Sequence, residues 1–300
     1  MFSRRHPFMF FTLALSSIAA VFLVVLLAMV LGSSVLFRSS MSSTFKQARG
    51  NVGIVEISGV IVSSKKVIQQ IKTFRDTPSI KAIVLRIDSP GGGVGPSQEI
   101  YREVMKTRKT KKVVASLGSV AASGGYYAAS ASDGIVANPG TITGSIGVIM
   151  EYANIQKIME KIGLTPVVIK SGEFKDMGSP VRELSTQERS ILQGVADEIH
   201  QQFVRDVATG RRIQQDRINK LADGRIYTGE KAVDLHMVDR LGNLDDAVNW
   251  AGEMAGIKEK IEPVYPKEDK MGFIKELVQT LFKQAYIAGS VSDYFRYVVK

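Results

Sequence analysis

The 300-residue sequence contains no cysteine, a single tryptophan and only three histidines. The lack of cysteine excludes a disulfide framework, thiolate metal ligands and a cysteine nucleophile. The few histidines restrict the choice of a general base, since none of His6, His200 and His236 stands in a motif that singles it out. A histidine-dependent triad stays open, but a lysine deserves more weight as the base for any serine nucleophile.

Acidic residues are the scarcer charged class: 39 Lys and Arg stand against 29 Asp and Glu, which gives a formal net charge of +10. The basic residues are spread along the chain without a dense block, so we expect an anionic membrane surface rather than nucleic acid as a partner. With 45% hydrophobic and 23% charged residues, the composition is that of a globular protein with room for one sizeable domain and an appendage.

No residue from 8 to 37 is charged. This run exceeds the roughly 20 apolar residues that a helix needs to cross a bilayer, and also the roughly 7 to 15 of a cleaved signal peptide. We therefore expect a basic N-terminus (1–7), an uncleaved transmembrane signal anchor (8–37) and a serine-rich linker (38–50). Basic residues on the two sides of the run nearly balance, so local charge does not decide its orientation. A basic N-terminus before a first apolar segment is typical of a signal anchor, and we therefore expect the remaining chain to lie outside the cytoplasm.

From residue 51 onward, β-rich runs alternate with helical patterns, which predicts an α/β domain over 51–257 with strands covered on both faces. The expected strands are 51–62, 81–88, 112–117, 134–138, 146–150 and 166–170. The expected helices are 66–75, 97–108, 185 onward, 216–223 and 244–256, and residues 225–242 are expected to form a turn and a helix. Beyond them, the tail (258–300) contains an amphipathic helix that could pack on a neighbouring subunit, the membrane or its own domain.

The helix expected to begin at Ser185 has the clearest start signal. Ser185 and Glu188 form a capping-box pattern. An apolar stripe follows at helical spacing, and we expect it to lie in the core: Ile191, Val195, Ile199 and Phe203.

Two glycine-rich segments directly follow expected strands. The first, DSPGGGVG from Asp88 to Gly95, lacks the Lys-Ser/Thr of a P-loop and does not fit the dinucleotide fingerprint. Its backbone N–H groups can approach a ligand closely and hold a developing oxyanion. In the second, SVAASGGYYA, Ser123 stands where a strand passes into a helix, and the N–H of Gly124 can point at the same reacting oxygen. A simple helix N-cap also fits Ser123.

A serine nucleophile without histidine needs another base. A lysine side chain serves only when burial lowers its pKa from about 10.4 toward neutrality. Lys175 in SGEFKDMGSP is the best candidate, because Phe174 and Met177 offer apolar walls. An ordinary solvated loop lysine fits the same sequence.

Five strings occur in the order of one known family: IDSPGGGV, SVAASGGYYAAS, ANPGTITGSIGV, KSGEFKDMGSP and GRIYTGEKAVDLHMVDRLGNLDDAV. Over about residues 52–255 the chain resembles the short-form bacterial signal peptide peptidases of the protease IV family. The resemblance implies a Clp protease/crotonase-like α/β fold of repeated β-β-α units, preceded by one transmembrane helix. It also implies a serine endopeptidase of the bacterial inner membrane that degrades remnant signal peptides and other apolar peptides, with no metal or cofactor.

The same resemblance implies roles for individual residues. Ser123 would be the nucleophile and Lys175 the base of a Ser-Lys dyad, with Ser145 in TGSIGV orienting the lysine. The backbone N–H groups of Gly92 and Gly124 would form the oxyanion hole. Short forms of the family assemble into homo-oligomeric rings, so one site can take its serine and its lysine from neighbouring subunits.

Three other hypotheses make different predictions. A Ser-Lys protease directed at stomatin-like membrane proteins would differ mainly in substrate. A crotonase-type acyl-thioester enzyme would bind a coenzyme A thioester. A non-catalytic, membrane-tethered scaffold would bind peptides without turnover and would be unaffected by Ser123→Ala.

Overall fold

The computed structural model describes Phe8 and residues 50–266. The chain divides into two units, Met1–Arg49 and Gly50–Lys300. The expected transmembrane anchor beyond Phe8 and the amphipathic helix of the tail lie outside the described residues. Within the described part, no helix combines the length and the apolar character needed to cross a bilayer.

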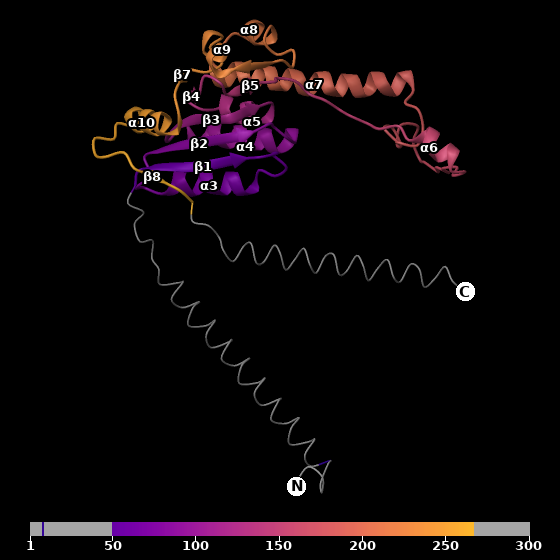
Figure 1. Ribbon diagram of the computed structural model, residues 1–300, viewed down its shortest axis with the longest axis horizontal. Helices are drawn as coiled ribbons and strands as arrows, with labels where there is room; N and C mark the ends of the chain where they lie inside the picture. The colour runs from indigo at the N-terminus through magenta and orange to yellow at the C-terminus, as the bar shows by residue number, and fades with distance from the viewer. Residues whose placement is uncertain (1–7, 9–49, 267–300) are drawn as a thin grey trace. The chain divides into compact units, whose positions relative to one another are not determined.

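An eight-stranded, largely parallel sheet forms the centre of the described residues (Figure 1). Its order is β6-β5-β3-β2-β1-β8, with β4 paired to β3 and β7. Only the pairing of β5 with β6 is antiparallel within this sheet. The strands are β1 (Val52–Ser58), β2 (Ala82–Ser89), β3 (Lys112–Ala122), β4 (Gly134–Ala137), β5 (Ile142–Gly144), β6 (Ile226–Thr228), β7 (Arg240–Leu241) and β8 (Pro263–Val264).

Helices cover both faces of the sheet, as the uniformly apolar strands predicted. Side chains alternate along each strand. In β2, Ile83 joins the cluster that includes Ile100, whereas Val84 joins the cluster that includes Val248. The first cluster lies under α3 (Lys65–Asp76), α4 (Val94–Thr107) and α5 (Gly124–Ser130), and the second under α10 (Leu244–Met254).

The long strand β3 positions the candidate site. Its beginning pairs with β4 and its end pairs with β5. The end of β3 therefore lies between β2 and β5, and the segments that follow β2, β3 and β5 meet at one edge of the sheet. In parallel sheets this edge, beyond the carboxyl ends of the strands, is where ligands bind.

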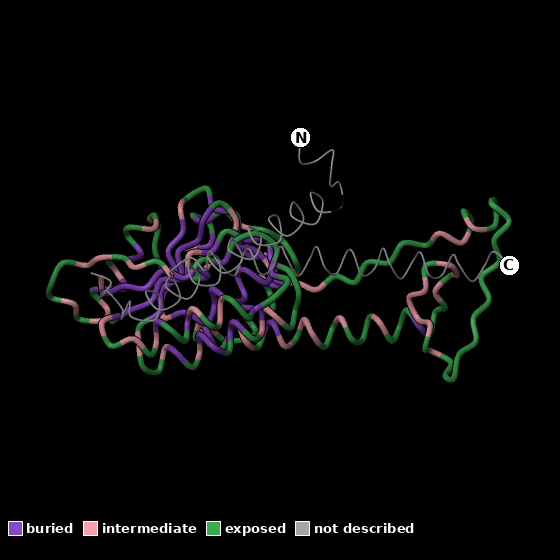
Figure 2. The backbone as a smooth tube through the Cα atoms, turned by 90° about the horizontal axis from the view of Figure 1, so that it is seen from below, coloured by how far each residue is buried: buried purple, intermediate pink, exposed green. Residues whose placement is uncertain are grey.

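The helix α7 (Thr186–Arg211) begins with the predicted capping box. At about 1.5 Å per residue its 26 residues span about 39 Å. Only its C-terminal half lies in the core, through Phe203, Val204 and Val207. Ile191 and Val195 are exposed, so the expectation that the whole stripe lies in the core is wrong for the first half of α7 (Figure 2).

Residues 147–185, here called the arm, connect β5 to α7 and contain α6 (Gln156–Lys161). The arm lies beside the N-terminal end of α7, at the opposite end from α5 (Figure 1). The strands expected at 146–150 and 166–170 are not formed. Val167 is 86% exposed and Ile169 is 98% exposed. A β-rich run needs a partner strand and a packed face to become a strand, and the described chain offers neither here. Two small helices, α8 (Gln215–Asn219) and α9 (Gly229–Asp234), complete the described elements.

Candidate active site

Ser123 is the junction between β3 and α5. Its backbone has φ 51° and ψ −121°, a conformation that residues with a side chain adopt only under strain. Two hydrogen bonds hold it there: the Ser123 N–H donates to the Gly144 carbonyl at 2.8 Å, and the Ser123 carbonyl accepts from the Tyr127 N–H at 2.8 Å. Its side chain makes no capping hydrogen bond. This is the strained strand-to-helix turn by which some folds present a nucleophilic serine.

The glycine-rich loop after β2 packs directly against this turn. A Cβ atom on Gly91, whose φ is 109°, would lie 2.8 Å from both the Gly124 nitrogen and the Ser123 Cβ. A Cβ atom on Gly92, whose φ is 158°, would overlap the backbone of Ile61. Ile61 holds the loop by two hydrogen bonds of 2.8 Å, one to Gly91 and one from Gly93. Only glycine permits this close approach at positions 91 and 92.

The backbone N–H groups of Gly92 and Gly124 lie beside Ser123 and have no acceptor among the described residues. A Cβ atom on Gly124 would lie 3.3 Å from the Gly92 nitrogen and would overlap Ser97 Oγ. The two nitrogens are therefore close neighbours. Paired, preorganised N–H donors beside a serine are suited to stabilise a tetrahedral oxyanion.

Ser145 follows β5 just as Ser123 follows β3. Ala122 pairs with Gly144 in parallel register, so the two serines leave neighbouring strands at the same level. Ser145 has φ 52°, and its N–H donates to the Arg225 carbonyl at 2.8 Å. Both serines are half-buried. The structure thus brings together four of the five predicted site residues: Ser123, Ser145, Gly92 and Gly124.

Lys175 lies elsewhere, exposed on the arm. Phe203 of α7 packs on Tyr127, with ring centroids 4.3 Å apart. Tyr127 lies on α5, one turn after Ser123. Glu188 stands near the start of α7, so about 22 Å of helix axis separates it from Phe203. The Lys175 turn is tied to Glu188, and no described contact joins Lys175 to Ser123. Phe174 and Met177 are only half-buried, so within one chain the expected apolar walls do not enclose the lysine.

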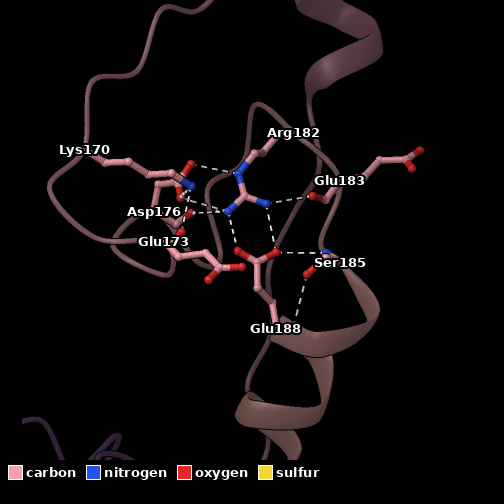
Figure 3. Close-up of polar contacts among 7 residues, drawn as sticks. All are labelled: Lys170, Glu173, Asp176, Arg182, Glu183, Ser185 and Glu188. Atoms are coloured by element: carbon pink, nitrogen blue, oxygen red, sulfur yellow. Dashed lines mark hydrogen bonds and ion pairs between the residues drawn. The ribbon is translucent and has the colours of Figure 1, made fainter.

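An ion-pair cluster joins Asp176, the residue next to Lys175, to the first turn of α7 (Figure 3). Arg182 bridges the carboxylates of Asp176 and Glu188. Hydrogen bonds from Arg182 and Lys170 hold the pKa of Asp176 well below its usual range. Hydrogen bonds from Arg182 and the Ser185 backbone lower the pKa of Glu188 to about 2. Both carboxylates are thus ionised near neutral pH.

Sequence reasoning missed two residues that shape these regions. Ser97 is buried on α4, donates to the Gly93 carbonyl at 2.9 Å and borders Gly124. Arg182 carried no sequence signal of its own, although its partner Glu188 was found through the capping box. Among the described residues, no group of three or more His, Asp or Glu is placed to hold a metal ion.

Two family models match the chain. The model described as Peptidase family S49 matches residues 105–258, and the Clp protease model matches residues 54–143, which agrees with the mixed α/β sheet. A putative protease, slr0021, of Synechocystis sp. is 45% identical over 217 residues, covering 71% of this chain and 78% of the relative. The putative signal peptide peptidase SppA of Enterococcus faecium is 36% identical over 246 residues, covering 77% and 71%.

Longer relatives and one solved structure also match. Protease 4 of Salmonella typhi is 34% identical over 220 residues, which are 70% of this chain but 35% of that relative, so this chain spans about a third of its length. The structure of the 1510-N membrane-bound stomatin-specific protease superposes with a TM-score of 0.49 at 15% identity, covering 74% of this chain and 100% of that one.

Proposed function

The chain belongs to peptidase family S49 and is a serine peptidase, and on this premise we propose that Ser123 is its nucleophile and Lys175 its general base. The observation that carries the proposal is the conformation of Ser123, held at a strained turn beside two N–H groups that lack acceptors among the described residues. Among the described residues, no hydrogen bond joins a histidine to Ser123. Lys175 occupies the matching position in the GEFKD string.

The chemistry follows from these groups. The neutral Lys175 amine takes the proton of the Ser123 hydroxyl, and the oxygen attacks a peptide carbonyl. The N–H groups of Gly92 and Gly124 donate to the resulting oxyanion. The lysine then gives its proton to the leaving amine, and water hydrolyses the acyl-enzyme by the same proton transfers. Ser145, beside Ser123, is suited to accept a hydrogen bond from the incoming lysine and orient it.

A second copy of the chain supplies the lysine in this proposal. Within one chain Lys175 is carried away from Ser123 by the arm, so the site is incomplete. The arm also exposes apolar side chains that water does not favour and that a neighbouring copy would cover: Ile149, Tyr152, Leu164, Val167 and Ile169. We therefore propose a homo-oligomeric ring in which each site combines Ser123 of one copy with Lys175 of the next.

Remnant signal peptides and other apolar peptides are the proposed substrates. The Enterococcus relative is named as a putative signal peptide peptidase, which supports this class. The uncharged run at 8–37 supports a single membrane anchor in the bacterial inner membrane, with the peptidase domain outside the cytoplasm. An anchor of this kind would keep the site where apolar peptides accumulate.

A fluorophosphonate probe tests the assignment of the nucleophile, because an activated serine attacks its phosphorus, displaces fluoride and is phosphonylated. We expect mass spectrometry to map the adduct to Ser123 in the full-length protein, and Ser123→Ala to remove both adduct and peptide turnover. Lys175→Ala should slow labelling of Ser123 strongly while leaving the assembly intact. An adduct on another serine, with turnover preserved in Ser123→Ala, would exclude the proposed nucleophile.

A further inference from the structure

The turn that carries Lys175 has little to hold it except polar contacts. Its internal hydrogen bonds are those of a local turn, such as Lys175 N–H to the Gly172 carbonyl at 3.2 Å and Met177 N–H to Phe174 at 3.1 Å. No residue from 146 to 187 except Ile146 is fully buried. A turn with so few buried contacts opens easily. A base, in contrast, must be held within about 1 Å of its working position.

Arg182 restrains the Lys175 turn through hydrogen bonds to Asp176. Its Nε donates to Asp176 Oδ2 at 2.8 Å, and its Nη2 donates to Asp176 Oδ1 at 3.0 Å and to the Asp176 carbonyl at 3.2 Å. Asp176 is the residue next to Lys175. The two parallel N–H donors grip the carboxylate in a planar fork, which fixes direction as well as distance. Figure 3 shows the guanidinium between the two carboxylates.

The other side of the same guanidinium holds Glu188. Arg182 Nη1 donates to Glu188 Oε2 at 2.9 Å, and Nη2 donates to Oε1. The Glu188 carboxylate also accepts from the Ser185 N–H at 2.9 Å as part of the capping box. Glu188 is only 4% exposed. Arg182 therefore joins the Lys175 turn to the first turn of α7.

The far end of α7 is fixed to the helix that follows the nucleophile. Tyr127 donates to Asp206 Oδ2 at 2.5 Å, and Tyr101 donates to the Asp206 carbonyl at 2.7 Å. Phe203 packs on the Tyr127 ring. A continuous helix thus connects the α5 packing to the Arg182 cluster, so the position of Lys175 relative to the core depends on that cluster.

We infer that Arg182 is a positioning residue that fixes Lys175 for catalysis by clamping Asp176 to the start of α7. The inference rests on the proposed role of Lys175 as base. Arg182 does not touch substrate in this scheme. Its effect on the reaction passes through Lys175 alone.

The test compares Arg182→Gln with Arg189→Gln. Both remove one arginine, but Arg189 is exposed on α7 and its side chain has no partner among the described residues. We expect Arg182→Gln to lower kcat about 100-fold with KM little changed, because a displacement of about 1 Å costs that much. Arg182→Lys should not rescue kcat, since an ammonium cannot bridge two carboxylates as a planar fork does. Arg189→Gln should retain wild-type kcat.

Ser123 labelling by the fluorophosphonate separates positioning from a general structural effect. If Arg182 acts only through Lys175, Arg182→Gln should slow labelling in the wild-type background and cause no further loss in the Lys175→Ala background. A further loss in that background would overturn the inference, as would wild-type kcat in Arg182→Gln.

Two more outcomes are distinguishable. If Arg182→Gln lowers Tm or breaks the assembly, Asp176→Ala decides the question, because it removes the carboxylate that Arg182 binds and keeps the Glu188 contact and the cap. Normal kcat in Asp176→Ala would overturn the inference. If Lys175→Ala itself retains turnover, the proposed dyad is wrong. The inference about Arg182 is then wrong as well, whatever Arg182→Gln shows.

Discussion

Ser123 and Ser145 leave the paired strands β3 and β5 at the same level, and both have positive φ, 51° and 52°. The Ser123 N–H donates to Gly144, the residue before Ser145, at 2.8 Å. One hydrogen bond thus ties the two turns together. Two strained serines side by side indicate that this sheet edge is built for chemistry rather than for stability.

The strain at Ser123 should be measurable. Ser123→Gly and Ser123→Ala both remove the hydroxyl, so we expect both to abolish turnover. Glycine adopts a positive φ without strain, whereas alanine is strained there. Ser123→Gly should therefore be more stable than Ser123→Ala by about 1 kcal/mol. Denaturant unfolding of the two variants measures the difference. If Ser123→Ala were instead the more stable variant by about 0.4–1 kcal/mol, the usual advantage of alanine over glycine, the backbone here would be unstrained.

The space around Gly124 makes a second prediction. Gly124→Ala should lower Tm, because the added Cβ overlaps Ser97 Oγ. Removing that oxygen in Ser97→Ala/Gly124→Ala should recover much of the lost Tm. Turnover should stay about 100-fold or more below wild type in the double variant, since the methyl group still crowds the Gly92 and Gly124 N–H groups. Thermal unfolding and peptide turnover report the two effects separately.

Gly140→Ala is the matched control, because a Cβ there meets nothing within 4 Å. It should leave both Tm and turnover unchanged. Full turnover in the Ser97→Ala/Gly124→Ala variant would argue against an oxyanion hole at these N–H groups.

The sequence predicted the core of the fold because its strands bury both faces. The run 81–88 became β2, and 112–117 became the first half of β3, since continuous apolar β-branched runs have one favourable place in a globular protein. The serine at position 123 was found because it follows such a strand. Its conformation was not predicted, because φ depends on the loop of Gly91 and Gly92 packing from another strand.

The same reasoning gave wrong predictions for the arm. Residues 166–170 have the composition of a buried strand, yet Val167 and Ile169 are exposed in the single chain. Ile191 and Val195 follow the helical period of a core stripe but extend beyond the core. In both cases the sequence pattern predicts an apolar surface that is buried against another surface. It does not indicate whether that other surface belongs to the same chain or to a second one. The Arg182 clamp was missed because it depends on Asp176 and Arg182 of the arm and Glu188 of α7, which only folding brings together.

Acid should release the clamp. The pKa of Glu188 is lowered to about 2, and that of Asp176 lies below its usual range, chiefly through hydrogen bonds from Arg182. A depressed carboxyl pKa stabilises the folded arm fully above the ordinary value, about 4.5 for Glu, and this stabilisation is lost as pH falls toward 2. We therefore expect the Lys175 turn to detach from α7 in that range.

Spin labels can follow this release, because the chain has no cysteine to compete. Gly172→Cys and Ser190→Cys place one label on the turn and one on α7, both at exposed positions. The distance distribution between them should broaden below about pH 4 and should already be broad at neutral pH in Arg182→Gln. A narrow distribution that is independent of both pH and Arg182 would show that other contacts hold the turn.

Mixed assemblies test whether the site is shared between copies. Ser123→Ala lacks the nucleophile and Lys175→Ala lacks the base, so each assembly alone should be inactive. After co-refolding, a site that pairs Ser123 from a Lys175→Ala copy with Lys175 from a Ser123→Ala copy is complete. Random mixing in a ring makes about a quarter of the sites complete, so turnover should return to about that fraction of wild type. If both residues of a site came from one chain, mixing could complete no site at any ratio. Recovery must also follow the product of the two fractions and peak at equal amounts, which a trace of wild-type contaminant could not reproduce.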